Sequence, residues 1–297
     1  MRTLRADGAV GGAANTALKL GVSEHLIGLT LVAFATSLPE LGASTMASFT
    51  NHGDIALGNV IGSNICNICL VLGAAALMIK LEPGKETFRD AVFMNLVAIL
   101  LFILLLDREI GRIDGIIFVV AFAGYTFYLY KTLHVGIGTK KGKIGKELLL
   151  VGLGATGVIV GAFLLVEGAI DIADRFGIDT IVIALFAVAF GTSLPELATS
   201  VSAALKRKHT ISIGNVLGSN IINILFVLGV AAIIRPINID SFGESVGDNI
   251  LYTTLPLLLF VSIITLLYSK RKIGRVNALF LLFMYCVFLY FLPGAAV

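Results

Sequence analysis

Residues 33–41 read AFATSLPEL, and residues 189–197 read AFGTSLPEL. Each stretch places a proline and a glutamate inside an apolar segment, and the first of these segments runs from Leu26 to Phe49 without another formal charge. A proline removes a helical hydrogen bond and its ring clashes with the preceding turn. The sequence therefore predicts two broken helices, each with a carboxylate at the break.

The composition indicates that these helices lie in a membrane. Of 297 residues, 57% are hydrophobic and only 14% are charged, with a mean hydropathy of +0.97, whereas soluble domains carry about 25% charged residues. Regular period-two alternation is absent, which disfavours an outer-membrane barrel. Most of the charge-poor stretches are long enough to span as helices; they are 26–49, 55–79, 91–106, 115–130, 148–166, 181–205, 211–234, 250–268 and 276–293. We therefore expect an all-α polytopic membrane protein of about ten helices, with a first helix before Gly21 that is apparently truncated.

The chain contains the same unit twice. At an offset of 156, residues 31–77 align without a gap to residues 187–233, with 26 identities in 47 positions. A second repeated block reads GNVIGSNICNI at 58–68 and GNVLGSNIINI at 214–224. The shared letters include Thr, Ser, Glu and Asn, which packing in lipid does not require. Internal repeats are typical of secondary transporters.

Loop charges predict that the two copies have opposite orientations. The loop after the first broken helix, TNHGD at 50–54, has no Lys or Arg, but its counterpart at 206–209 is KRKH. The positive-inside bias places Lys208 in the cytoplasm and Asn51 outside. We therefore divide the chain into a first half at 1–130 (helices 1–5), a basic cytoplasmic connector at 131–147, and an inverted second half at 148–297 (helices 6–10).

The two glutamates are the strongest functional candidates. Burying Glu40 or Glu196 in a membrane costs at least ~2.5 kcal/mol, and intramembrane carboxylates are functional by default. The neighbouring prolines free the carbonyls of Ala35 and Gly191 from helical hydrogen bonding, and irregular backbone at this depth is tolerated only inside protein or along a cavity. A bound cation is one partner for these oxygens.

The second block supplies a polar helix face. Asn59, Ser63 and Asn67 follow one another at i, i+4 and i+8, and so share one side of a helix. Asn215, Ser219 and Asn223 repeat the pattern. Glycines at GxxxG spacing in both blocks favour close helix packing on an adjacent face; they are Gly58, Gly62, Gly214 and Gly218. Hydrogen bonds between helices without any ligand are the alternative explanation of the polar face.

The donor atoms favour a hard cation. Carboxylates, carbonyls, hydroxyls and amides are all oxygen ligands, and all four histidines lie in loops or at segment ends. Ca²⁺ takes 6–8 oxygens in flexible geometry, Mg²⁺ keeps its waters, and soft transition metals prefer nitrogen or sulfur. Calcium fits this set best.

GTSLPE and GNVxGSNIxNI, once in each half, resemble the two alpha-repeats of the cation/calcium exchanger superfamily, especially its prokaryotic sodium/calcium exchangers. The resemblance implies two inverted five-helix repeats in a prokaryotic cell membrane, and Ca²⁺ and Na⁺ as transported ions at a mid-membrane site. It implies Glu40 and Glu196 as shared ligands, helped by the backbone carbonyls of Thr36 and Thr192. The residues implied for the flanking sodium sites are Ala33, Ser37, Ser63 and Asn67, with Ala189, Ser193, Ser219 and Asn223.

One departure from the family pattern bears on the coupling ion. Well-studied members often carry an aspartate where this chain has Asn223, so its site holds two carboxylates rather than three. Sodium coupling is the favoured hypothesis, and Ca²⁺/H⁺ antiport is the alternative.

Other classes of function fit less well. A channel would use the same ligands, but paired broken helices describe a closed site with two gates better than a pore. An intramembrane hydrolase would need GxSxG or GxGD, and neither occurs. The CxxC at Cys66 and Cys69 lacks a second pair, so buried thiols are the expected state. We expect a monomeric antiporter in the lipid bilayer, without enzyme activity, organic cofactor or nucleic-acid partner.

Overall fold

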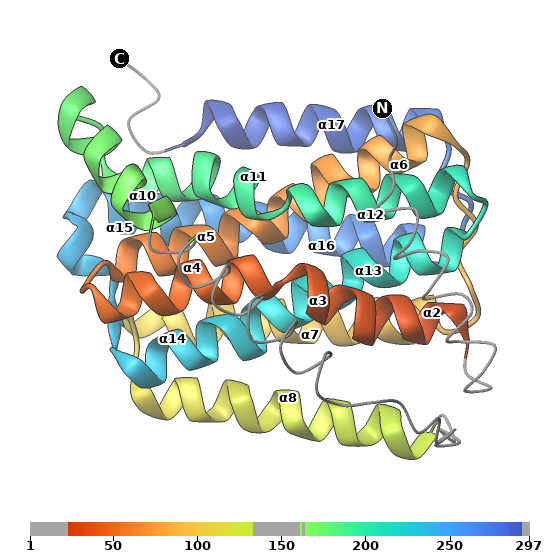
Figure 1. Cartoon of the computed structure of the whole chain (residues 1–297), viewed down its shortest axis with the longest axis horizontal. Coiled ribbons are helices and arrows are strands. Elements are labelled where there is room, and N and C mark those ends of the chain that lie inside the picture. Colours follow the sequence, from red (N-terminus) through yellow and green to blue (C-terminus); the bar gives the residue numbers. More distant parts are fainter. Residues whose placement is uncertain (1–22, 133–160, 162–163, 293–297) are drawn as a thin grey trace, which may run out of the picture.

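The computed structural model describes residues 23–132, 161 and 164–292. Long helices lie side by side along the longest axis of the molecule (Figure 1). The first half contains α2 (Glu24–Ile27), η1 (Gly28–Val32), α3 (Ala33–Thr36), α4 (Leu38–Phe49), α5 (Gly53–Cys66), η2 (Asn67–Leu72), α6 (Gly73–Met78), α7 (Thr87–Leu104), η3 (Leu105–Asp107), β1 (Glu109–Ile110) and α8 (Arg112–Thr132).

Seven elements of the second half repeat those of the first at the predicted offset of 156 residues. They are α10 (Thr180–Ile183), η4 (Ala184–Val188), α11 (Ala189–Thr192), α12 (Leu194–Leu205), α13 (His209–Ile222), η5 (Asn223–Leu228) and α14 (Gly229–Ile234). The remaining elements are β2 (Ile237–Asn238), η6 (Ile239–Phe242), α15 (Glu244–Asn249), η7 (Ile250–Thr254), α16 (Leu255–Tyr268) and α17 (Arg275–Tyr290). The sequence repeat is therefore a repeat of structure.

Both predicted broken helices are present. The helices meeting at Ser37 and those meeting at Ser193 are bent by 43°. In each case the proline is the second residue after the break, where its missing amide removes no bond that the new helix needs. Each glutamate follows directly, in the first turn of α4 or α12. The proline thus bends the helix and starts the turn that carries the carboxylate.

The two halves run in opposite directions, as predicted. The turn after α4 lies beside the start of α10, because Asp54 accepts a hydrogen bond from the Thr180 hydroxyl. The turn after α12 lies beside the start of α2, where Lys208 Nζ is 2.5 Å from Glu24 Oε1. Figure 1 shows these two pairs at opposite ends of the molecule. We call them the Asn51 end and the Arg207 end, after the exposed residues at the tips of the two turns.

Glycines hold the halves together. A Cβ added to Gly62 on α5 would lie 2.4 Å from the Leu185 carbonyl oxygen, and one added to Gly218 on α13 would lie 2.1 Å from the Leu29 carbonyl oxygen. Only glycine permits this approach, so the GxxxG prediction of close packing is confirmed. α5 thus packs against the second broken helix at its π-helical segment η4, and α13 packs against the first broken helix at its π-helical segment η1.

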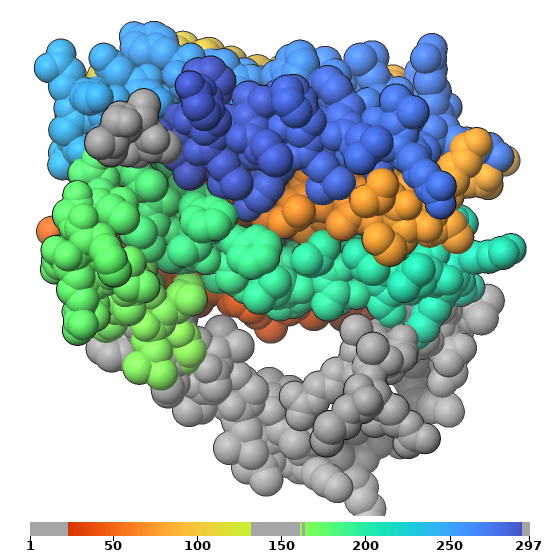
Figure 2. All heavy atoms as spheres, turned by 90° about the horizontal axis from the view of Figure 1, so that it is seen from above, coloured from red at the N-terminus to blue at the C-terminus, as the bar shows by residue number. Residues whose placement is uncertain are grey.

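The remaining helices surround this centre. In an apolar 18-residue window of the span Gly53–Met78, 83% of the residues are buried within the protein, and in that of His209–Ile234 the share is 78%. The corresponding shares are 44%, 22% and 44% in the spans that include α7, α8 and α16. Figure 2 shows the face covered by α17, which packs against α6. Short backbone pairings join loops at each end, Ile110 with Ile237 and Leu81 with Ile273. The repeated motifs therefore lie at the core.

The helical membrane fold is confirmed, but the predicted number of ten spans is not. The described residues contain five helices that are long and apolar enough to span, up to seven with each bent pair counted as one, and the shorter helix α17. The expected first helix before Gly21 lies outside the described residues, as do most of 148–166 and of the connector at 131–147. The division into two halves with this connector stays a prediction.

The membrane orientation can be tested at the turns. Asn51 and Arg207 are equivalent, exposed, and both have positive φ, 67° and 60°, so a cysteine meets the same backbone conformation in Asn51→Cys and in Arg207→Cys. We expect an impermeant thiol reagent outside intact cells to label only Asn51→Cys, because the basic loop stays inside. The background is a variant without Cys66, Cys69 and Cys286. Labelling of both cysteines from outside would contradict the predicted orientation.

Candidate ion-binding site

The two predicted glutamates meet across the interface between the halves. Glu40 and Glu196 are both fully buried, with 0% exposure. The Ser193 hydroxyl donates to Glu40 Oε1 at 3.3 Å, and the Ser37 hydroxyl donates to Glu196 Oε1 at 3.4 Å. Each carboxylate is therefore held by the serine of the other half's TSLPE motif, and neither half forms the site alone.

One oxygen of each carboxylate is left over. Glu40 Oε2 and Glu196 Oε2 are buried and have no hydrogen-bond partner among the described residues. The same is true of both side-chain polar atoms of Asn67 and of Asn223 Oδ1. Buried polar groups almost always have a partner, so these oxygens are free to bind a cation.

The threonine hydroxyls are already used. The Thr36 hydroxyl donates to Asn215 Oδ1 at 3.3 Å, and the Thr192 hydroxyl donates to Asn59 Oδ1 at 3.1 Å. Each bond again crosses between the halves. Thr36 and Thr192 are the last residues before the breaks, which leaves their backbone carbonyls as the groups available to an ion.

The serines of the second block break the symmetry. The Ser219 hydroxyl donates to Glu196 Oε1 at 3.4 Å. Its counterpart Ser63 instead lies 3.4 Å from both the Ala189 carbonyl oxygen and the Thr192 hydroxyl. The Ala189 carbonyl also accepts from the backbone amide of Ser193 at 3.1 Å. Among the described residues, the Ser37 and Ser219 hydroxyls therefore donate to Glu196 and the Ser193 hydroxyl donates to Glu40, so the surroundings of the two carboxylates differ.

The Ala33 carbonyl occupies the position equivalent to that of Ala189. It accepts from the Ser37 backbone amide at 2.9 Å and from the Thr36 hydroxyl at 3.2 Å. The Asn223 amide donates to Asn64 Oδ1 at 3.2 Å. All twelve predicted site residues are thus buried in the region where the broken helices and the second blocks meet.

Sequence reasoning missed a supporting layer around the site. The Asn59 amide donates to the Glu40 carbonyl at 3.3 Å and to the Ser44 hydroxyl at 2.9 Å, and Asn215 makes the equivalent bond to Ser200 at 3.0 Å. Ser44 and Ser200 are identical in the two repeats. That identity four residues after each glutamate was the available signal.

A second missed pair joins the halves. The amides of Asn64 and Asn220 each donate to the backbone carbonyl of the other at 3.4 Å. These asparagines are also identical between the repeats, at the offset of 156 residues. They belong to the GSN of the second block, next to the predicted serines rather than on the predicted polar face.

The donor set is that of a hard cation. No group of three or more His, Cys, Asp and Glu side chains gathers anywhere in the described part of the chain, so carbonyls, hydroxyls and amides must supply the rest of any coordination shell. Cys66 and Cys69 are buried free thiols, as expected. Two carboxylates surrounded by neutral oxygens fit Ca²⁺ or Na⁺ better than a transition metal.

Inverted halves that share one site at their interface, as here at the pair of buried carboxylates, are typical of secondary transporters. The family model described as "Sodium/calcium exchanger protein" matches residues 3–131 and 146–293, so the chain belongs to the sodium/calcium exchanger family. It is therefore a membrane antiporter rather than an enzyme, and a multi-pass protein of the cell membrane.

Individual relatives agree. The chain is 35% identical to the putative antiporter CaxA of Alkalimonas amylolytica, over 97% of this chain and 93% of that protein. It is 33% identical to the sodium/calcium exchanger MaX1 of Methanosarcina acetivorans, over 94% and 92%. A solved structure of the sodium-calcium exchanger NCX_Mj, soaked with Na⁺ and Sr²⁺, is similar with a TM-score of 0.75 and 33% identity, over 95% of this chain and 91% of that one.

Proposed function

We propose that this chain exchanges Ca²⁺ for Na⁺ by alternating access, with Glu40 and Glu196 as ligands of both ions. The observation that carries the proposal is the pair of buried carboxylates, one from each half, each with an oxygen that lacks a partner within the described residues. An unpaired buried charge costs several kcal/mol. A bound cation compensates both charges at once, and the names of MaX1 and NCX_Mj support the choice of ions.

The carbonyls of Thr36 and Thr192 complete the centre of the proposed calcium site. Both threonine hydroxyls are held by asparagines of the other half, which fixes the backbone at each break. Two carboxylates, two carbonyls and water reach the 6–8 oxygens that Ca²⁺ takes. These ligands come from both halves, so relative movement of the halves changes which end of the molecule the ion can reach.

The proposed sodium sites flank this centre. Na⁺ carries one positive charge where Ca²⁺ carries two, so its site needs fewer negatively charged ligands. Neutral oxygens lie on both sides of the carboxylates. One set comprises Ala33, Ser37, Ser63 and Asn67, and the other Ala189, Ser193, Ser219 and Asn223. The unpaired amide oxygens of Asn67 and Asn223 support this assignment. Because Ser219 faces a carboxylate and Ser63 does not, the two sets should differ in affinity.

Ca²⁺/H⁺ antiport is the second candidate, and Asn223 is the observation that favours it. With only two carboxylates in the site, two protons balance the charges as well as one Ca²⁺ does. Two Na⁺ do so too, whereas a third Na⁺ would have to bind among neutral oxygens. The hydroxyl and amide groups present in both halves lead us to favour sodium.

Calcium-45 uptake into sodium-loaded liposomes tests the driving ion. We expect uptake at fixed pH to require internal Na⁺. If three Na⁺ leave for each Ca²⁺, every cycle moves one net charge, worth ~2.3 kcal/mol per 100 mV, and uptake should respond to a potential set by valinomycin and K⁺.

Each alternative has its own outcome in this experiment. Uptake that ignores Na⁺ but follows a pH gradient would reassign the chain to Ca²⁺/H⁺ exchange. Sodium-driven uptake that is independent of voltage would rule out the third Na⁺. Absence of calcium uptake under any gradient would contradict calcium antiport altogether.

A further inference from the structure

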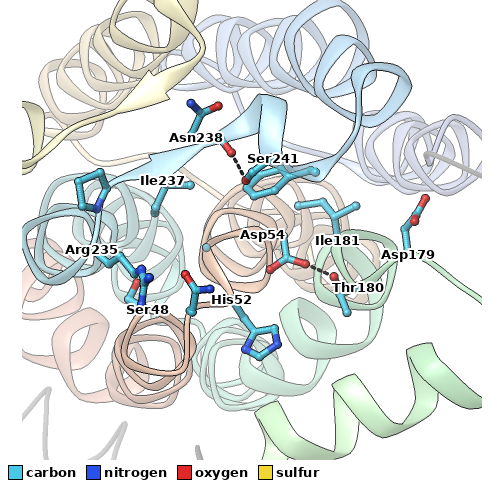
Figure 3. A pocket seen from close by; sticks show the side chains of 14 residues that line it. Ser48, His52, Asp54, Asp179, Thr180, Ile181, Arg235, Ile237, Asn238 and Ser241 are labelled. Atoms are coloured by element: carbon cyan, nitrogen blue, oxygen red, sulfur yellow. Dashed lines mark hydrogen bonds between the residues drawn. The ribbon is translucent and has the colours of Figure 1, made fainter.

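A polar pocket of about 380 Å³ lies at the Asn51 end of the molecule (Figure 3). It is bounded by the turn between α4 and α5, by the start of α10, and by the segment from Arg235 to Phe242. Both halves therefore contribute to it. None of its residues belongs to the candidate ion site described above.

Ser48 lines this pocket and lies on α4, the helix that carries Glu40 of the ion site. Its side chain is 1% exposed, lines the pocket, and its hydroxyl has no hydrogen-bond partner among the described residues. Ser48 lies on α4 eight residues after Glu40, on the same face and about 12 Å along the helix. Ser44, between them, is also fully buried. A buried free hydroxyl at the pocket wall is a polar atom available to a ligand.

The charged residues of the pocket favour a cation. The pocket lining contains two carboxylates, Asp54 and Asp179, and one guanidinium, that of Arg235, so the formal charge of its Asp and Arg residues is −1. Asp54 accepts from the Thr180 hydroxyl, and Asp179 precedes α10 without capping it through its side chain. In Figure 3, Asp54 lies between Ser48 and Asp179. Among the described residues, neither Asp54 nor Asp179 forms an ion pair with Arg235. Their negative charges are therefore not neutralised by this arginine.

The Arg207 end lacks these groups. The equivalents of Asp54, Asp179 and Arg235 are Thr210, Ser23 and Ile79, and that of Ser48 is Ala204. Two acidic residues at that end are paired instead: Lys208 contacts Glu24 at 2.5 Å, and His25 contacts Asp90 at 2.8 Å. The pocket is therefore not a by-product of the repeat, and it marks one of the two ends.

We infer that this pocket captures hydrated divalent cations and delivers them to the ion site from the Asn51 end. The pocket residues do not form a group of three acidic, histidine or cysteine ligands within the part of the chain described. It is therefore suited to holding an ion with its water shell, not to chelating it. A negative cleft raises the local concentration of cations and so their rate of entry. This inference rests on the proposed calcium transport.

Opposite charge changes give the sharpest test. Asp54→Asn raises the net charge of the pocket by one, and Arg235→Gln lowers it by one. For Ca²⁺ entering from the Asn51 end, we expect Asp54→Asn to raise KM about three- to tenfold and Arg235→Gln to lower it, both with the maximal rate unchanged. KM for Ca²⁺ entering from the Arg207 end should not change. Vesicles of the two orientations allow both measurements.

The controls separate the pocket from general charge and from folding. Asp174 is exposed at the same end outside the pocket, so Asp174→Asn removes a carboxylate but should leave KM unchanged. Asp179→Asn removes the other carboxylate of the pocket, whose side chain caps no helix, and it should raise KM as Asp54→Asn does. It takes the place of Asp54→Asn in the test if that variant folds poorly. Raising ionic strength from about 0.01 M to 1 M shortens the Debye length from about 30 Å to 3 Å and should reduce every difference.

A binding measurement keeps this inference separate from the transport proposal. In the Glu40→Gln, Glu196→Gln double variant, we expect dialysis to detect weak calcium-45 binding that the addition of Asp54→Asn removes.

KM shifts of the same sign for Asp54→Asn and Arg235→Gln would overturn the inference, as would equal shifts for Ca²⁺ entering from the two ends. If the pocket instead binds anions, Arg235→Gln should abolish chloride or phosphate binding and leave calcium-45 binding unchanged. That outcome would also overturn the inference. If the wild type does not transport Ca²⁺, the proposed function fails, and the dialysis still decides on the pocket.

Discussion

Glu40→Gln and Glu196→Gln should each abolish calcium exchange while leaving the protein folded. A carboxylate charge and a divalent ion about 2.4 Å apart attract by about 14 kcal/mol at an effective dielectric of about 20. Lost hydration offsets most of this attraction, but a net loss of even about 3 kcal/mol weakens binding about a hundredfold. The unliganded protein should be as stable as the wild type or more stable, because a buried charge is gone.

Calcium-45 exchange in liposomes and thermal unfolding in detergent check both expectations. Glu244→Gln makes the same chemical change at an exposed position and should transport normally. Glu40→Asp and Glu196→Asp keep the charge and should retain part of the activity. Calcium transport at the wild-type rate by either glutamine variant would remove that glutamate from the ligand set.

The repeated motifs made most of the fold predictable. Pro39 and Pro195 located both bends, because the loss of a helical amide has the same consequence in any helix. The opposite loop charges at Asn51 and Lys208 predicted antiparallel halves, which the structure has. The number of ten spans stays a prediction, since the expected first helix and most of 148–166 lie outside the described residues, in which five to seven spans are long and apolar enough to cross a membrane.

The centre of the site was predictable, but its supporting contacts were not. Glu40 and Glu196 stand out in sequence because a membrane-embedded carboxylate is costly. Which serine holds which carboxylate depends on how the halves cross, and no spacing within one half reveals that Ser193 contacts Glu40. The pocket at Asp54 is harder still to predict, because it exists only where residues 48–54, 179–181 and 235–242 come together.

Gly218→Ala should destabilise the protein and remove most of its transport activity, although the change adds only one methyl group. The new Cβ would lie 2.1 Å from the Leu29 carbonyl oxygen and 2.7 Å from the Ala33 Cβ. Both neighbours belong to the first broken helix, so relief of the clash requires a shift of the helix that carries Thr36 and Ser37 into the site. Overpacking of this kind costs ~1–3 kcal/mol or more.

Gly191→Ala is the matched control for that prediction. Gly191 lies within the second TSLPE block, where the first repeat already has Ala35, and a Cβ there would meet nothing within 4 Å. We therefore expect Gly191→Ala to keep its melting temperature and its calcium-45 exchange, whereas Gly218→Ala should unfold at a lower temperature. Gly62→Ala should behave like Gly218→Ala, because its Cβ would lie 2.4 Å from the Leu185 carbonyl oxygen of the other broken helix. Wild-type stability and exchange in Gly218→Ala would show that the broken helix can move away from α13 without disturbing the site, and would contradict the role of glycine in joining the halves.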